Sequence, residues 1–204
     1  MSKKIVVITG SPRGNGNSFA MTDAFIKEAE AKGHHVTRFD AATKNLGGCH
    51  ACETCFKSGK ACSYDDDFNQ IAPDILEADV VVFTMPVYWY SIPAQIKCVI
   101  DKLFSFCVAG KDVAGKECAL ITCCEEDDMS VMDGAALLSA SEALFPAMDP
   151  AAPRRCQGID SKACHNAAGA VVHMAADSGV CCSRHHDIGR VLRCIIINIK
   201  IAVI

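Results

Sequence analysis

The sequence has no excess of basic residues. Among its 204 residues, 20 lysines and arginines are outnumbered by 24 aspartates and glutamates, which gives a net charge of −4 and a pI near 5.9. Proteins that bind nucleic acid concentrate basic side chains against the phosphates. We therefore expect no nucleic-acid partner.

Long hydrophobic runs are absent as well. The run at residues 5–8 is too short for the apolar region of a secretory signal. The run at residues 194–204 is too short to span a bilayer and contains Lys200. Half of the residues are hydrophobic and 22% are charged, which is typical of globular proteins. We expect a cytoplasmic protein with no membrane partner.

Cysteine is missing from the first 48 residues, although the chain contains 14 cysteines. Four of them gather in one short segment, as Cys49-x-x-Cys52-x-x-Cys55 followed by Cys62. Such a group can ligate a [4Fe–4S] cluster, or it can serve as cluster-free thiols or a redox disulfide. Zinc fits the spacing less well, because tetrathiolate zinc sites usually use two separated pairs.

Strand-like and helix-like patterns alternate along the first 130 residues. Strands are expected over residues 5–9, 34–39, 79–84 and 118–122, and helices over residues 17–32, from residue 65 and from Pro93. We expect Asn17 or Ser18 to cap the first helix and Pro73 to kink or split the second. This order predicts an α/β fold, a doubly wound parallel sheet with helices on both faces.

The pattern fades after about residue 130. Residues 1–130 are expected to form the core domain, and residues 131–204 an atypical C-terminal segment that completes it or is appended to it. Only residues 191–204 again resemble a strand. The lost periodicity suggests a diverged or frame-shifted stretch, which resequencing of the coding DNA would decide.

The segment from Gly10 to Ser18 joins a strand, a glycine-containing turn and the start of a helix, an arrangement that binds phosphate. A P-loop would need lysine where Asn17 follows Gly16. A dinucleotide dehydrogenase loop has similar glycine spacing, and Asp40 could bind a ribose. No tyrosine has the lysine four residues later that those enzymes use. A terminal monophosphate is favoured, with Ser11, Arg13, Asn17 and Ser18 as its contacts.

A second loop, at residues 86–92, follows a buried strand and contains two tyrosines and the single tryptophan. These side chains can form flat apolar walls for an aromatic ligand, or they can belong to the core or to a dimer interface. Thr122 and Cys123 end the next strand at the same edge of the sheet, so we assign them to the site by position.

Two motifs carry a family resemblance: Gly10-Ser11-Pro12-Arg13-x-x-Gly16-Asn17-Ser18 and the run from Pro86 to Lys97. Together they resemble the NADPH-dependent FMN reductase family of flavodoxin-like proteins. The resemblance implies bound FMN, NAD(P)H as co-substrate, and Pro86, Val87, Tyr88 and Trp89 against the isoalloxazine ring. It also implies a homodimer or larger assembly. No catalytic side chain is expected, because the flavin supplies the chemistry.

Three functions follow from these motifs. The first is an FMN-dependent oxidoreductase that passes hydride from NAD(P)H through FMN to a small-molecule or protein acceptor. The second is an electron-transfer protein, because the cysteine motif resembles that of iron–sulfur flavoproteins, relatives of these reductases. The third is a flavin-free binding or regulatory domain.

Overall fold

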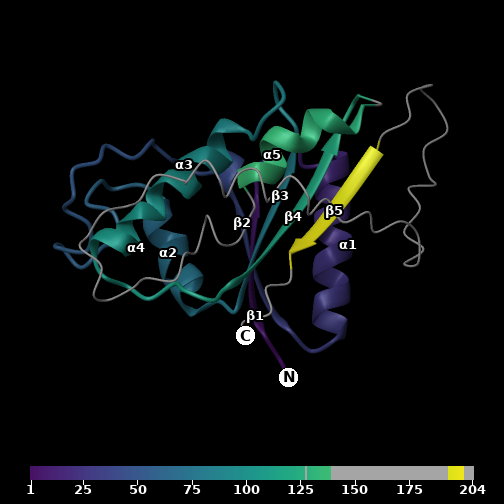
Figure 1. Cartoon of the computed structure of the whole chain (residues 1–204). Helices are drawn as coiled ribbons and strands as arrows, with labels where there is room; N and C mark the ends of the chain where they lie inside the picture. The colour runs from purple at the N-terminus through teal and green to yellow at the C-terminus, as the bar shows by residue number, and fades with distance from the viewer. Residues whose placement is uncertain (127, 139–192, 200–204) are drawn as a thin grey trace.

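The computed structural model describes residues 1–126, 128–138 and 193–199 (Figure 1). Five strands form one sheet in the order β2-β1-β3-β4-β5. Their bounds are β1 Lys4–Thr9, β2 His35–Asp40, β3 Val80–Pro86, β4 Glu117–Cys124 and β5 Arg193–Ile199. The first four strands are parallel, and this order is that of flavodoxin-like proteins. The predicted α/β flavodoxin-like fold is confirmed.

The central strands are buried on both faces because they are almost continuously apolar. In β1, Val6 and Ile8 pack into one core cluster, whereas Ile5 and Val7 pack into a second cluster on the other face. Alternation of side chains along a strand produces this division. The sheet is therefore packed on both faces, and its connecting loops lie at the two ends of the strands.

Helices cover the two faces unequally among the described residues. Helix α1 (Asn17–Ala31) packs against one face through Met21, Phe25 and Ala29. Helices α2 (Phe68–Glu77), α3 (Ala94–Lys102) and α4 (Phe104–Val108) pack against the other face. Figure 1 shows α1 on one side of the sheet and these three on the opposite side. The two remaining turns of 3₁₀ helix are η1 (Ala41–Thr43) and η2 (Met129–Met132).

Two expectations about the helices need correction. The N-cap of α1 is Gly16, so Asn17 and Ser18 already belong to the helix and cannot cap it. Pro73 lies inside α2 and does not split it. The lost amide removes one helical hydrogen bond, whereas the buried Phe68, Ile71 and Ile75 hold the helix against the sheet.

Strand β5 runs antiparallel to β4, which corrects the expectation of a wholly parallel sheet. An antiparallel edge strand is common on such sheets, because it needs no right-handed crossover. Helix α5 (Asp133–Leu138) was not foreseen; its Ala135 joins the core. The proposed division at residue 130 stays a prediction, and residues 139–192 and 200–204 of the C-terminal segment lie outside the described residues.

Among the described residues, no helix has the length and apolar character needed to cross a membrane.

Cys118 on β4 provides a test of the buried sheet. Burial raises the pKa of its thiol from 9.0 to about 12. We expect iodoacetamide at pH 8 to leave Cys118 unmodified in the native protein and to alkylate the exposed Cys49 and Cys52 of cluster-free protein. Peptide mass spectrometry measures this, with guanidinium-unfolded protein as the fully labelled control. Equal labelling of Cys118 and Cys52 in native protein would contradict the burial of β4.

Candidate functional site

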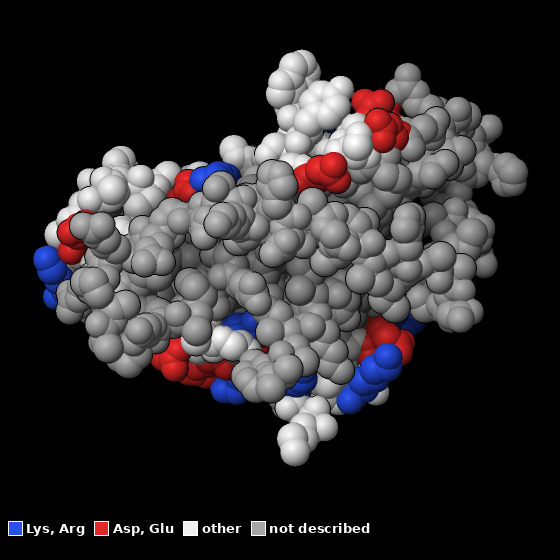
Figure 2. Space-filling view, viewed as in Figure 1, with Lys and Arg blue, Asp and Glu red and all other residues white. Residues whose placement is uncertain are grey.

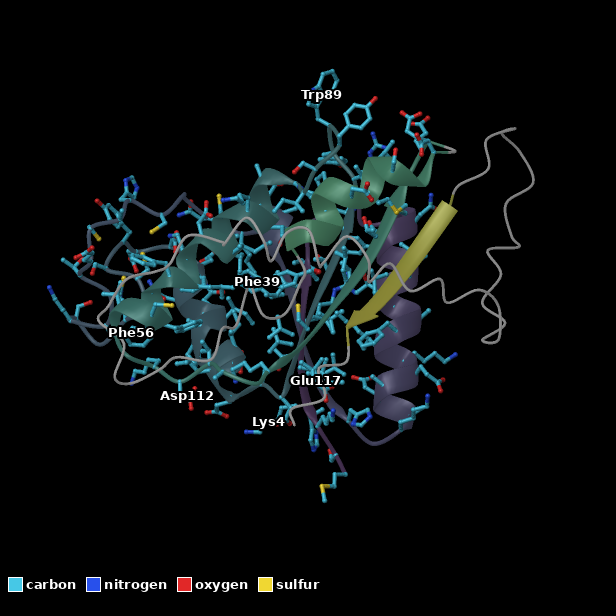
Figure 3. All side chains as sticks on the ribbon, viewed as in Figure 1. Lys4, Phe39, Phe56, Trp89, Asp112 and Glu117 are labelled. Atoms are coloured by element: carbon cyan, nitrogen blue, oxygen red, sulfur yellow. The ribbon has the colours of Figure 1, made fainter. Side chains whose placement is uncertain are left out.

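The loops that follow the four parallel strands meet at one edge of the sheet. The backbone N–H of Gly10, after β1, donates to the carbonyl of Thr84 in β3 at 2.8 Å. The N–H of Val87, after β3, donates to the carbonyl of Cys123 in β4 at 2.8 Å. Figure 3 shows Trp89 at this carboxyl edge, with Lys4 and Glu117 at the opposite end of the sheet. Ligands of such sheets bind at this edge, where the chain leaves β1 and β3 toward opposite faces of the sheet.

The loop after β1 is folded around its own polar groups. The Ser11 hydroxyl accepts the N–H of Arg13 at 3.2 Å, and the Arg13 carbonyl accepts the N–H of Gly16 at 3.0 Å. Ser11 and Ser18 are buried, whereas Arg13 and Asn17 are exposed. The structure thus brings the four predicted phosphate contacts together on one loop and one helical turn.

The N-terminus of α1 is open to an anion. No side chain among the described residues caps it, and its first turn contains no acidic residue. A 15-residue helix leaves its first N–H groups without helical partners and carries a partial positive charge at this end. Phosphate oxygens would satisfy both.

Gly10 makes this close arrangement possible. A Cβ atom at this position would lie 2.4 Å from Ile96 Cγ1 of α3 and 3.3 Å from Met85 Cβ of β3. Both neighbours are buried, so neither can move aside freely. A side chain at residue 10 would therefore force the loop or α3 to shift.

Asp40 argues against the dinucleotide alternative. Its carboxylate accepts the Thr9 hydroxyl at 2.8 Å and pairs with the Arg38 guanidinium at 2.7 Å. Arg38 also pairs with Asp23 of α1 at 2.6 Å. The acid that a ribose would need thus has a structural role: its Oδ1 ties β2 to β1, and its partner Arg38 ties β2 to α1.

The aromatic loop after β3 turns sharply at its tip. Tyr88 and Ser91 exchange two backbone hydrogen bonds of 2.9 and 3.0 Å, and both residues between them, Trp89 and Tyr90, have positive φ angles of 50° and 61°. Such two-residue turns favour Asn-Gly, because other residues lose energy in this conformation. The turn leaves Trp89 93% exposed, so two large aromatic residues are held outward by unfavourable backbone angles.

Thr122 and Cys123 lie at the end of β4, and both are buried. The Thr122 hydroxyl has no hydrogen-bond partner among the described residues. The carbonyl of Cys123 accepts a hydrogen bond from the N–H of Val87. Gly134 of α5 approaches the same loop so closely that a Cβ atom there would lie 2.4 Å from the Tyr90 carbonyl oxygen.

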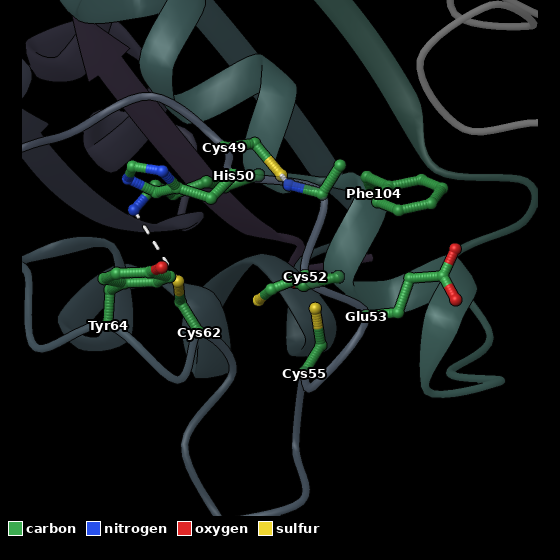
Figure 4. Close-up of a pocket in the computed structure, with 11 residues that line it drawn as sticks. Cys49, His50, Cys52, Glu53, Cys55, Cys62, Tyr64 and Phe104 are labelled. Carbon is green, nitrogen blue, oxygen red and sulfur yellow. Dashed lines mark hydrogen bonds between the residues drawn. The ribbon is translucent and has the colours of Figure 1, made fainter.

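The four cysteines predicted to act together lie in the loop between β2 and α2, and all four line one pocket (Figure 4). None of the four thiols forms a disulfide in the described structure. Three non-glycine residues among them, Ala51, Glu53 and Phe56, have positive φ angles of 51–58°. Sparsely populated backbone angles concentrate at functional sites. Here they turn the chain repeatedly between consecutive cysteines.

Hydrogen bonds already reach two of these sulfur atoms. Cys49 Sγ accepts the N–H of Ala51 at 3.5 Å, and Cys52 Sγ lies 3.0 Å from the Thr54 hydroxyl oxygen. The Thr54 contact lowers the pKa of Cys52, whereas burial raises the pKa of Cys55.

The inner wall of this pocket contains polar residues that the sequence did not reveal. Lys102, the last residue of α3, forms an ion pair with Asp66, and their side chains are only 2% and 8% exposed. Lys102 Nζ also lies 3.7 Å from Cys62 Sγ. Ser105 of α4 lines the same pocket, and its buried hydroxyl has no partner among the described residues.

No group of three or more histidine, cysteine, aspartate or glutamate side chains in the described part of the chain is placed to hold a single metal ion. A [4Fe–4S] cluster makes a different demand, since each of its four irons takes one thiolate and the thiols surround the cluster. Four thiols around one pocket, with an unpartnered hydroxyl beside them, fit that donor set.

On the face that Figure 2 shows, acidic and basic residues of the described part are interspersed, and no continuous basic surface is visible.

Curated relatives match about half of the chain. An iron-sulfur flavoprotein of Archaeoglobus fulgidus is 36% identical over 103 residues, which cover 50% of this chain and 46% of that protein. An iron-sulfur flavoprotein of Methanocaldococcus jannaschii is 33% identical over 101 residues, 48% of this chain and 50% of that protein. The chain therefore spans about half the length of these relatives.

Two solved structures share the fold. RosB with bound 8-demethyl-8-formylriboflavin-5′-phosphate has a TM-score of 0.54 at 15% identity, over 73% of this chain and 62% of that one. An FMN-dependent NADH-azoreductase from Bacillus anthracis in complex with FMN has a TM-score of 0.51 at 12% identity, over 70% of this chain and 81% of that one. At these identities the likeness concerns the fold alone.

A family model described as NADPH-dependent FMN reductase matches residues 3–145. The matched residues include the loop from Gly10 to Ser18, the four cysteines of the pocket and the aromatic turn after β3. The chain belongs to the NADPH-dependent FMN reductase family, as its two sequence motifs predicted.

Proposed function

We propose that the protein is an FMN-dependent oxidoreductase that takes hydride from NAD(P)H and passes electrons to an acceptor. The observation that carries this proposal is the open N-terminus of α1, beside the tight Gly10 turn and next to the exposed aromatic loop. The N-terminus of α1 suits a phosphate, and the aromatic loop suits a flat ring. Family membership points the same way.

Each part of the site has a distinct task in this proposal. Ser11, Arg13, Asn17 and Ser18 bind the FMN phosphate, with Arg13 supplying a full positive charge. Pro86, Val87, Tyr88 and Trp89 border the ring, and Thr122 and Cys123 close the site from β4. FMN, when bound, supplies the hydride and electron chemistry. The protein binds it, orients it and excludes water.

Steady-state kinetics tests the enzymatic proposal. If NAD(P)H and the acceptor react in turn at one flavin, double-reciprocal plots at several quinone concentrations are parallel, as in ping-pong kinetics. Intersecting plots with NADPH and free FMN as the two substrates would contradict a resident flavin. The acceptor is a small molecule such as a quinone, a flavin or a nitro compound, or a protein. The homodimer and the cytoplasmic location stay predictions.

A second function, electron transfer as an iron–sulfur flavoprotein, is favoured by the cysteine pocket. All four cysteines line it, and five of the similar curated proteins bear that name. In this proposal Cys49, Cys52, Cys55 and Cys62 ligate one [4Fe–4S] cluster near the flavin.

The cluster proposal predicts metal content. Protein purified or reconstituted without oxygen is expected to contain about four irons and four acid-labile sulfides per chain, as one cluster requires. Cys62→Ser is expected to lose most of this iron, because one ligand is gone. Cys98→Ser, on α3 outside the pocket, is the matched control and keeps it. Iron-free wild-type protein after reconstitution would exclude the cluster and leave the FMN proposal intact.

The flavin-free alternative predicts a colourless protein that does not quench FMN fluorescence. The uncapped helix and the outward aromatic turn argue against it.

A further inference from the structure

The inner wall of the cysteine pocket contains a buried lysine, which pairs with the buried Asp66, and a buried hydroxyl, and no step of the proposed hydride transfer uses them. We propose that Lys102 and Ser105 are positioning residues that donate hydrogen bonds to the cluster's sulfur ligands, and that Lys102 raises the reduction potential of the cluster. This inference rests on the proposed [4Fe–4S] site.

The location of Lys102 is the first argument. Its Nζ lies 3.7 Å from Cys62 Sγ, within hydrogen-bond range for a sulfur acceptor, while its side chain is 2% exposed. Lysine is almost never fully buried unless it is paired. A helix C-terminus favours a cation, and Lys102 is the last residue of α3. The fold thus holds a positive charge beside one predicted ligand.

Asp66 explains how the charge can be buried. Its carboxylate pairs with Lys102 and also accepts the N–H groups of Gly47 and Phe68, both at 3.1 Å. Asp66 therefore ties the start of the cysteine loop to α2 and leaves the ammonium group on the pocket side. The pair forms a dipole, and its positive end is the one in contact with Cys62.

Ser105 provides the independent observation. Its hydroxyl is buried, lines the cysteine pocket and has no hydrogen-bond partner among the described residues. Buried polar groups are nearly always satisfied, and an unsatisfied one calls for a missing partner. A sulfur atom of the cluster or of its ligands would be that partner.

The sign of the effect follows from charge. Reduction adds one electron to the cluster, so a positive charge and hydrogen bonds at its sulfur atoms stabilise the reduced form. Removing Lys102 should lower the potential, whereas removing Asp66 should raise it. A purely structural ion pair would give no such opposite signs.

The experiment is a redox titration of the anaerobically reconstituted full chain, followed by visible absorption and by electron paramagnetic resonance, with iron and sulfide counted for every variant. Lys102→Met is expected to reduce the equilibrium constant for one-electron reduction at least tenfold, which is about 59 mV. Ser105→Ala is expected to shift it less in the same direction, and Asp66→Asn in the opposite direction. Lys4→Met, which breaks an exposed ion pair at the far end of the sheet, should change nothing.

The outcomes separate this inference from the cluster itself. Wild-type protein without iron overturns the cluster and this inference with it. Fully loaded Lys102→Met with the wild-type potential overturns this inference alone. If Lys102→Met does not bind the cluster, the potential of Asp66→Asn is compared with that of the double variant Asp66→Asn with Lys102→Met. The double variant leaves no buried charge unpaired. An equal potential in those two variants also overturns the role of Lys102.

A further readout needs no cluster. Ser105→Ala is expected to raise the thermal midpoint of cluster-free protein, because it removes an unsatisfied buried hydroxyl. A lower midpoint would show that the hydroxyl has a partner within the protein, and would overturn its assignment to the cluster.

Discussion

Gly10→Ala is expected to destabilise the fold and to weaken FMN binding together. The added Cβ would lie 2.4 Å from Ile96 Cγ1 and 3.3 Å from Met85 Cβ. Because both neighbours are buried, the loop or α3 has to shift, which costs about 1–3 kcal/mol of unfolding free energy. A shift at this point also displaces the start of α1, so we expect FMN affinity to fall at least about tenfold, roughly 1.4 kcal/mol.

Gly14→Ala in the same loop is the matched control. A Cβ atom there has no described atom within 4 Å, so we expect a stability change within about 0.5 kcal/mol. Urea denaturation gives the unfolding free energies, and quenching of FMN fluorescence gives the dissociation constants. If both alanine variants bind FMN as the wild type does, the close packing at Gly10 is not needed for FMN binding, which would contradict the account.

Replacing Trp89-Tyr90 by Asn-Gly is expected to stabilise the protein while weakening its flavin site. Both residues have positive φ angles in a two-residue turn, and relief of this conformation is worth roughly 1–2 kcal/mol per residue. Asn-Gly adopts such turns readily. The lost aromatic contact of Trp89, roughly 0.5–1.5 kcal/mol, should reduce FMN affinity by up to about tenfold.

The Ala-Ala variant at the same two positions separates backbone from side chains. It removes both aromatic groups and leaves the positive φ angles, so it should lose FMN affinity without the gain in stability. Thermal unfolding and FMN titration of the two variants measure the two effects. An Asn-Gly variant that is less stable than the wild type would contradict the strain in this turn.

The sheet could be predicted from the sequence because its strands are strongly patterned. The β-branched runs at β1 and β3 are buried on both faces; β1 is followed by Gly10, and β3 ends at Pro86. Strand β5 could be located from its isoleucines, but its antiparallel direction could not. Direction depends on the route of the preceding chain, and a local pattern contains no information about that route.

The candidate site was only partly visible in the sequence. Its loops are contiguous motifs, so Ser11 and Trp89 could be named from spacing and residue type. Lys102 and Ser105 of the pocket, and Asp66 that pairs with Lys102, could not, because only the fold brings these separate parts of the chain together. Lys102 stands in an amphipathic helix that also contains Lys97 and Asp101, where a lysine usually marks the solvent face, yet it is buried.

The central claim is that the loop from Gly10 to Ser18 binds the phosphate of FMN. The most direct measurement compares the dissociation constants of FMN and riboflavin, which differ only in that phosphate, by fluorescence quenching of the purified chain. At least two charge-assisted hydrogen bonds of about 1.5–3 kcal/mol each predict that FMN binds roughly 100-fold more tightly or better. Equal dissociation constants for FMN and riboflavin would contradict the account.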